Sequence, residues 1–121
     1  TIKIPTDKSL SDELAQTAII CGEKIHRGTV ASGDTFIASD ELKNVLATEF
    51  DAICGEMEGG AIGHVCAANQ VPFAVLRSIS DGGNADAQID YPTFKMMAAN
   101  ISSSIIINFI KKQKTQLSFE L

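Results

Sequence analysis

Two short apolar runs, each followed closely by an acidic residue, constrain the fold of this chain most. Residues 52–56 (AICGE) lead to Glu58, and residues 73–79 (FAVLRSI) lead to Asp81. Such runs are typical of buried strands, which gain nothing from a terminal carboxylate unless it has a function. Ligands of open α/β sheets bind at the carboxyl ends of the strands, so the two acids are predicted to face one pocket.

The rest of the chain alternates between helical and strand patterns. The predicted elements are a helix over 8–22 capped at Thr6-Asp7, a strand over 25–31, a helix from Ser39 to Phe50, a strand over 52–56, a helix over 59–69, a strand over 73–79, a polar Gly-rich loop over 80–90 and a long helix whose first residue is Pro92. This order predicts an α/β fold, with a parallel sheet covered by helices on both faces.

Three strands make a narrow sheet, whereas some predicted helix faces are strongly apolar. Residues 105–110 (IIINFI) need more partner surface than such a sheet offers. We therefore expect the chain to be part of a larger domain, or a subunit with an extensive interface.

Composition excludes several classes of partner. The 121 residues carry a net charge of -5, which argues against nucleic acids and anionic membranes. No apolar run approaches the length of a membrane span. Cys21, Cys54 and Cys66 show neither metal-ligand nor Cys-x-x-Cys spacing, so we expect reduced, buried thiols in a cytoplasmic protein.

Three motifs carry a resemblance to a known family. They are Ser32-Gly-Asp-Thr-Phe-Ile37, Gly55-Glu-Met-Glu58 and Arg77-Ser-Ile-Ser-Asp81. In order and spacing the chain resembles the 5'-methylthioadenosine/S-adenosylhomocysteine nucleosidases of the nucleoside phosphorylase superfamily. The resemblance extends to about residue 112 and covers only the C-terminal half of a typical member. It implies that residues 1–121 are the C-terminal half of one three-layer α/β/α sandwich, with 113–121 as a loose tail.

The resemblance also implies a role for each matching residue. Asp81 corresponds to the general acid that protonates N7 of adenine, and Glu58 to the carboxylate that accepts hydrogen bonds from the ribose hydroxyls. The other matches are Phe36, which would stack on adenine, Ile37, whose backbone would read the base edge, Met57, which would pack on the sugar, Ser80, which would help to place the aspartate, and Tyr91, which stands where the family usually has Phe over the sugar.

Hydrolysis of an N-glycosidic bond needs two acids in opposite protonation states. Adenine leaves as a neutral base only if N7 is protonated, and a carboxylic acid can do this near neutral pH when burial raises its pKa well above about 3.9. The sugar develops positive charge, which an ionised carboxylate stabilises. Strand alternation predicts Glu56 on the same face as Glu58. Only one is needed, so Glu56 is predicted to be structural or to support the site, with Arg77 orienting a glutamate through an ion pair.

The main departure within the motifs is Gly59-Gly60, where the family commonly has Ala or Thr, and glycine weakens the start of a helix. The larger departure is the family's water-activating glutamate and nucleoside loop, which belong to the N-terminal half. We therefore expect a fragment that hydrolyses its substrate poorly on its own.

Several alternatives stay open. A purine nucleoside phosphorylase shares the Met-Glu and Ser-Asp elements, but no arginine follows Arg77 to hold phosphate, which favours water as the nucleophile. Futalosine hydrolases and AMP nucleosidases are other relatives. A non-catalytic nucleoside-binding protein is an alternative of another class, against which the presence of both Asp81 and Glu58 argues. The resemblance implies a homodimer with neither metal nor cofactor, and leaves the preference among 5'-substituted adenosines open.

Overall fold

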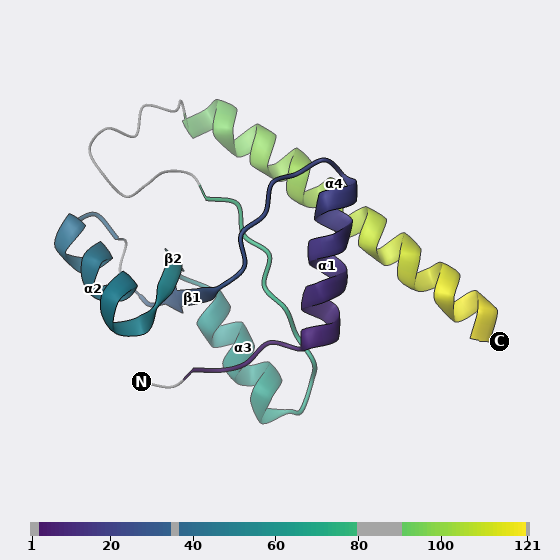
Figure 1. Ribbon diagram of the computed structural model, residues 1–121, viewed down its shortest axis with the longest axis horizontal. Coiled ribbons are helices and arrows are strands. Elements are labelled where there is room, and N and C mark those ends of the chain that lie inside the picture. Colours follow the sequence, from purple (N-terminus) through teal and green to yellow (C-terminus); the bar gives the residue numbers. More distant parts are fainter. Residues whose placement is uncertain (1–2, 35–36, 80–90, 121) are drawn as a thin grey trace.

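The computed structural model describes residues 3–34, 37–79 and 91–120, except for the side chains of residue 91 and of residues 115–120. The elements in chain order are α1 (Lys8–Ile20), β1 (Thr29–Ser32), α2 (Asp40–Phe50), β2 (Ala52–Glu56), α3 (Gly59–Ala68) and α4 (Tyr91–Glu120). The strands β1 and β2 pair in parallel. Figure 1 shows α2 and α3 beside these strands, and α1 lying across the long α4. The chain is thus an α/β protein, as predicted.

Two helices begin at the side chains that the sequence suggests as caps. The Asp7 carboxylate accepts a hydrogen bond from the Leu10 N–H at 2.8 Å, which starts α1. The Ser39 hydroxyl accepts one from the Leu42 N–H at 3.2 Å, which starts α2. Such bonds satisfy N–H groups that have no partner within the helix. Helix α2 ends at Phe50, and the left-handed backbone of the next residue, Asp51 (φ 53°), turns the chain directly into β2.

The strand predicted over residues 25–31 is shorter and later than expected, because its partner strand is short. Thr29 pairs with Ala52, the first residue of β2, which only Asp51 separates from the end of α2. Residues 25–28 therefore have no β2 backbone beside them to complete a ladder. Gly28 lies against the next strand's side chains instead, where a Cβ atom would come within 2.8 Å of Ile53 Cγ2.

The prediction of a strand over residues 73–79 is wrong. The segment runs from α3 towards α4 without joining the sheet (Figure 1). The recorded backbone bond of this described segment joins the Asp7 N–H to the Phe73 carbonyl at 2.7 Å. Residues 73–79 and β1 both line a cavity of about 1490 Å³ instead of pairing. An apolar run predicts burial, but it becomes a strand only where a neighbouring backbone supplies the hydrogen bonds.

The helices α1 and α4 pack against each other and hold the small core. Among the described residues the buried hydrophobic side chains are Ala18, which is fully buried, and Ile105, which is 4% exposed. Large apolar side chains that stay exposed are Ile19, Ile20, Ile53, Met57, Ile62, Val65, Val71, Ile79, Met96, Met97, Ile106, Ile107 and Ile110. This much exposed apolar surface agrees with the expectation that the chain needs more partner surface than it contains.

Three smaller expectations can be compared with the structure. Residues 113–120, expected in a loose tail, continue α4 as far as Glu120. The three cysteines are free thiols as expected, but each is partly exposed rather than buried. None of the helices in the described part of the chain combines the length and the apolar character that crossing a membrane requires. The predicted loop over 80–90 lies outside the described residues.

Candidate functional site

The carboxyl ends of the two parallel strands lie side by side and form the base of the candidate site. Ser32, the last residue of β1, pairs with Glu56, the last residue of β2, and the Gly33 N–H donates to the Glu56 carbonyl at 3.1 Å. Helix α3 begins three residues later at Gly59. The site therefore stands where two strands end and a helix starts, which is the usual ligand-binding edge of an α/β sheet.

Glu56 turns its carboxylate into the protein and binds the start of α3. The side chain is 1% exposed. Its Oε2 accepts hydrogen bonds from the N–H of Glu58 at 3.0 Å and of Gly59 at 2.7 Å, and Oε1 also accepts from Gly59 at 2.9 Å. The Ser32 hydroxyl, at the end of the neighbouring strand, accepts from the Gly60 N–H at 2.8 Å. A buried charge is tolerated when it is bonded in this way.

These bonds lower the pKa of Glu56. Burial by itself acts to raise it, but the hydrogen bonds from Gly59, Ser32 and Glu58 and the positive charge of Arg77 outweigh burial. The carboxylate is therefore ionised at neutral pH. In the same strand, burial raises the pKa of the Cys54 thiol, and the negative charge of Glu56 adds to this effect.

Glu58 stands in the opposite environment. Its side chain is 63% exposed, and Arg77 Nη2 lies 3.4 Å from its Oε2. Arg77 also approaches the buried carboxylate, with Nη1 3.9 Å from Glu56 Oε2. The guanidinium thus bridges the two glutamates and leaves the Glu58 carboxylate accessible to a ligand.

The predicted common face of Glu56 and Glu58 is wrong. Strand β2 ends at Glu56, so the alternation of side chains stops there. Glu58 is the residue before α3, with a backbone at φ −123° and ψ −35° that is neither strand nor helix. One carboxylate is consequently buried while the other faces solvent.

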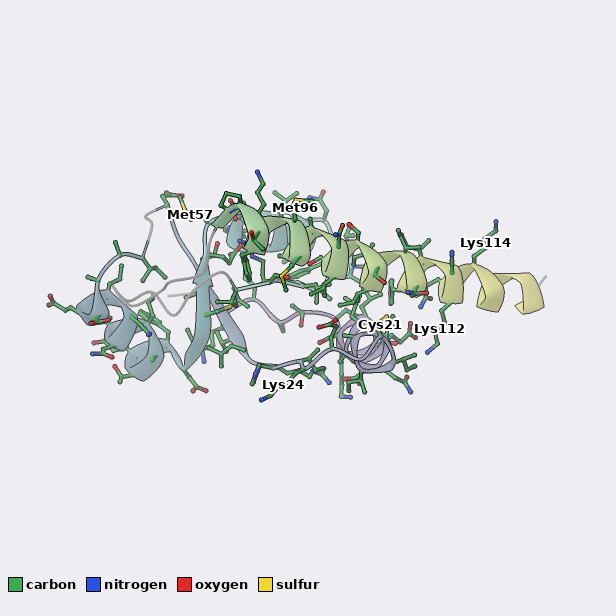
Figure 2. The ribbon with its side chains drawn as sticks, turned by 90° about the horizontal axis from the view of Figure 1, so that it is seen from above. Cys21, Lys24, Met57, Met96, Lys112 and Lys114 are labelled. Carbon is green, nitrogen blue, oxygen red and sulfur yellow. The ribbon has the colours of Figure 1, made fainter. Side chains whose placement is uncertain are left out.

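The other predicted site residues divide into those that the structure describes and those that it does not. Met57 is exposed beside Glu58, and Figure 2 shows it on the same side of the molecule as Met96 of α4. Ile37 covers β2 so closely that a Cβ atom at Gly55 would overlap its side chain. The predictions that lie outside the described residues are Phe36, Ser80 and Asp81, together with the side chain of Tyr91.

Ser32 is a site residue that the sequence-based prediction missed. It opens the first family-like motif, but no role was attached to it. The signal that could have found it is its position at the end of the first strand, because the ends of neighbouring parallel strands meet at one edge of the sheet. The Gly59-Gly60 pair is also explained here. A Cβ at Gly59 would lie 2.9 Å from Glu56 Oε1, and one at Gly60 would lie 2.7 Å from Ser32 Cβ.

Comparison with known proteins finds the same fold in nucleosidases. The Phosphorylase superfamily sequence profile matches residues 2–111. A 5'-methylthioadenosine/S-adenosylhomocysteine nucleosidase of Haemophilus influenzae is 39% identical over 108 residues, which are 88% of this chain and 47% of the relative. An aminodeoxyfutalosine nucleosidase of Campylobacter jejuni is 32% identical over 111 residues, 92% of this chain and 48% of the relative.

Solved structures give the same result. A 5'-methylthioadenosine/S-adenosyl homocysteine nucleosidase of Campylobacter jejuni superposes with a TM-score of 0.82 at 32% identity, over 90% of this chain and 48% of that one. The native futalosine hydrolase of Helicobacter pylori gives a TM-score of 0.80 at 34% identity, over 90% and 47%. The chain spans about half the length of the curated relatives it matches.

Fold and strand-end site together define an α/β protein of the nucleoside phosphorylase fold, containing about half of that fold. Because the family profile matches nearly the whole chain, this protein belongs to the phosphorylase superfamily. Its relatives include nucleosidases.

Proposed function

We propose that this protein contributes to the hydrolysis of the N-glycosidic bond of 5'-methylthioadenosine and S-adenosylhomocysteine, releasing adenine and the 5'-thioribose. The observation that carries the proposal is the unequal pair of glutamates at the end of β2. Glu56 is buried and bonded, whereas Glu58 is accessible beside Arg77. An accessible carboxylate at this place is suited to accept hydrogen bonds from vicinal sugar hydroxyls and to stabilise positive charge on the sugar.

The remaining roles follow the resemblance residue by residue. Asp81 donates a proton to N7 of adenine, and Ser80 helps to place it. Phe36 stacks on the base, and the Ile37 backbone reads the base edge. Met57 and Tyr91 contact the sugar. Of these, Met57 has the support of an exposed side chain next to Glu58.

A second substrate class has specific support. Relatives of Campylobacter jejuni and Helicobacter pylori that are named aminodeoxyfutalosine nucleosidases are 32% and 35% identical to this chain. Aminodeoxyfutalosine is therefore the alternative substrate. The two classes share the N-glycosidic bond and differ in the 5' substituent.

We also propose which catalytic groups this chain supplies. It supplies the acid and the ribose-binding carboxylate, while the base that activates water lies in polypeptide that corresponds to the other half of the relatives. A nucleosidase of this kind works as a cytoplasmic homodimer without metal or cofactor. The free thiols agree with a reducing compartment, and exposed apolar residues such as Ile107 supply interface surface.

The test measures adenine released by the purified product of the native gene, whose intact mass is first verified. Substrates are 5'-methylthioadenosine, S-adenosylhomocysteine and aminodeoxyfutalosine, each with and without phosphate. We expect release that does not depend on phosphate, and a loss of at least about 100-fold in the D81N variant, since general acid catalysis contributes about that much or more. Equal activity of D81N and wild type, or an absolute requirement for phosphate, would contradict the proposal.

The 121-residue chain assayed alone gives a further check. We expect turnover far below that of a complete relative, because the activating base is not among its residues. Full turnover by an intact 12.9 kDa species would overturn this part of the proposal.

A further inference from the structure

We propose that Glu56 is a positioning residue that holds Glu58 at the start of α3 with its carboxylate directed outwards. Ser32, Gly59 and Gly60 complete the device. The inference rests on the proposed function, because it assigns Glu58 the task of binding the sugar. We call the four residues Ser32, Glu56, Gly59 and Gly60 the carboxylate clamp.

Glu56, and not Glu58, binds the backbone at the start of α3. The residue that precedes a helix usually caps it with its own side chain. Glu58 occupies that place before α3 but forms no capping hydrogen bond with its side chain. Glu56, two residues earlier, bonds the N–H groups of Glu58 and Gly59 instead. The carboxylate of Glu58 is thereby released from capping and remains accessible.

The carboxylate clamp connects three elements. Glu56 ends β2, Ser32 ends β1, and Gly59 and Gly60 begin α3. Glu56 accepts from the Gly59 N–H and Ser32 accepts from the Gly60 N–H, so the start of α3 is tied to both strands. A position fixed by rigid elements in this way is more accurate than one on a free loop.

The start of α3 lies very close to both strands. The helix start lies so close to the two strands that a Cβ at Gly59 would meet Glu56 and one at Gly60 would meet Ser32 at under 3 Å, so a larger residue at either position would shift these contacts. The glycines weaken the first turn of α3 intrinsically, and the clamp bonds offset this weakness. The Gly59-Gly60 pair and Glu56 therefore act together.

The charge of Arg77 also connects Glu56 with Glu58. Two carboxylates near one another repel, and Arg77 lies between them at 3.9 Å from Glu56 and 3.4 Å from Glu58. An ionised Glu56 helps to hold the guanidinium where it can orient Glu58. Replacing Glu56 by glutamine removes that charge, and it also places an NH2 group among N–H donors that need an acceptor.

The test compares wild type with the variants E56Q, E58Q and E49Q in the native gene product. Glu49 is an exposed residue of α2 and serves as the matched control. The first measurement is the affinity for 5'-methylthioadenosine relative to its 2'-deoxy analogue, with adenine alone as a probe of the base site. A charge-assisted hydrogen bond to the sugar corresponds to a preference of about 10-fold or more. We expect E56Q to lose most of this preference, as E58Q does, while both variants retain the affinity for adenine and E49Q behaves as wild type.

The second measurement does not depend on a nucleoside. In an isotope-labelled sample the backbone N–H signals of Glu58 and Gly59 are followed by NMR as pH is lowered. We expect both signals to shift together as Glu56 is protonated, and we expect no such shift in E56Q. In E56Q these two N–H groups should also exchange with solvent at least about 10-fold faster, whereas E49Q leaves them unchanged.

The outcomes separate the inference from the proposed function. If wild type binds no nucleoside, the proposed function fails, and the NMR experiment still decides whether Glu56 fixes the Glu58 backbone. If wild type prefers the ribose form and E56Q keeps the full preference, the inference is overturned while the proposed function stands. N–H signals of Glu58 and Gly59 that ignore the protonation of Glu56 would also overturn it.

Discussion

Replacing Glu56 by glutamine is expected to destabilise the protein strongly at neutral pH and much less in acid. The side chain is 1% exposed. Its carboxylate accepts from the N–H of Glu58 at 3.0 Å and of Gly59 at 2.7 Å. A hydrogen bond to a charged group contributes about 1.5–3 kcal/mol, and a buried donor left without a partner costs about 1–3 kcal/mol.

Glutamine has nearly the same shape but only one acceptor oxygen. In the place of Oε2 that oxygen can keep the bonds from Glu58 and Gly59 but without the negative charge, while the NH2 group takes the place of Oε1 and faces the Gly59 N–H, with which it cannot bond. We therefore expect the free energy of unfolding to fall by about 2–4 kcal/mol at pH 7. This is a large part of the total stability of a small domain.

The effect depends on pH in a defined direction. The folded-state pKa of Glu56 is lowered, so its contribution is fully present above the unfolded value of about 4.3 and is lost as pH falls through the folded value. Urea unfolding of wild type, E56Q and the control E49Q should thus show a difference between wild type and E56Q that is largest at neutral pH and shrinks in acid. A loss below about 0.5 kcal/mol at pH 7, or a difference that stays constant as pH is lowered, would refute the reasoning.

Other predictions follow from single contacts. Replacing Ile105 by alanine, at 4% exposure in the contact of α1 with α4, should lower the free energy of unfolding by about 2–4 kcal/mol, whereas S103A at an exposed polar position of the same helix should cost well under about 1 kcal/mol. Equal effects in urea unfolding would contradict the assignment of the core. S39A removes the cap bond to the Leu42 N–H and should cost about 1 kcal/mol, and an unchanged urea midpoint would show that the cap contributes nothing. R77A should weaken binding of ribonucleosides more than of their 2'-deoxy analogues, because the guanidinium lies 3.4 Å from Glu58; equal weakening of both would argue that Arg77 acts elsewhere.

Local signals in the sequence predicted much of the fold. Ser39 and Asp7 cap helices where short polar side chains precede helical patterns, and the apolar run at residues 52–56 is a strand as expected. The failures concern partners that a local pattern does not contain. Residues 73–79 are as apolar as a strand but have no backbone ladder in the described structure. The strand expected over 25–31 shortens because β2 starts opposite Thr29.

The candidate site shows the same limit. Alternation along a strand placed Glu56 and Glu58 on one face, and it failed because the strand ends between them. The motif predicted Glu58 and Met57 as site residues, but nothing local revealed that Ser32 would bind the start of α3 from the neighbouring strand. The Gly59-Gly60 pair looked like a weak helix start, and its reason is a contact between elements. Pairing across the sheet decides these features, and it depends on the whole fold.

The most direct test of the central claim is the fate of the sugar when the purified native gene product acts on 5'-methylthioadenosine in water labelled with heavy oxygen and containing phosphate. Hydrolysis predicts free adenine and a 5'-methylthioribose that carries one labelled oxygen atom at its anomeric carbon. An unlabelled sugar phosphate, or the absence of any adenine release from this and the other 5'-substituted nucleosides, would contradict the claim.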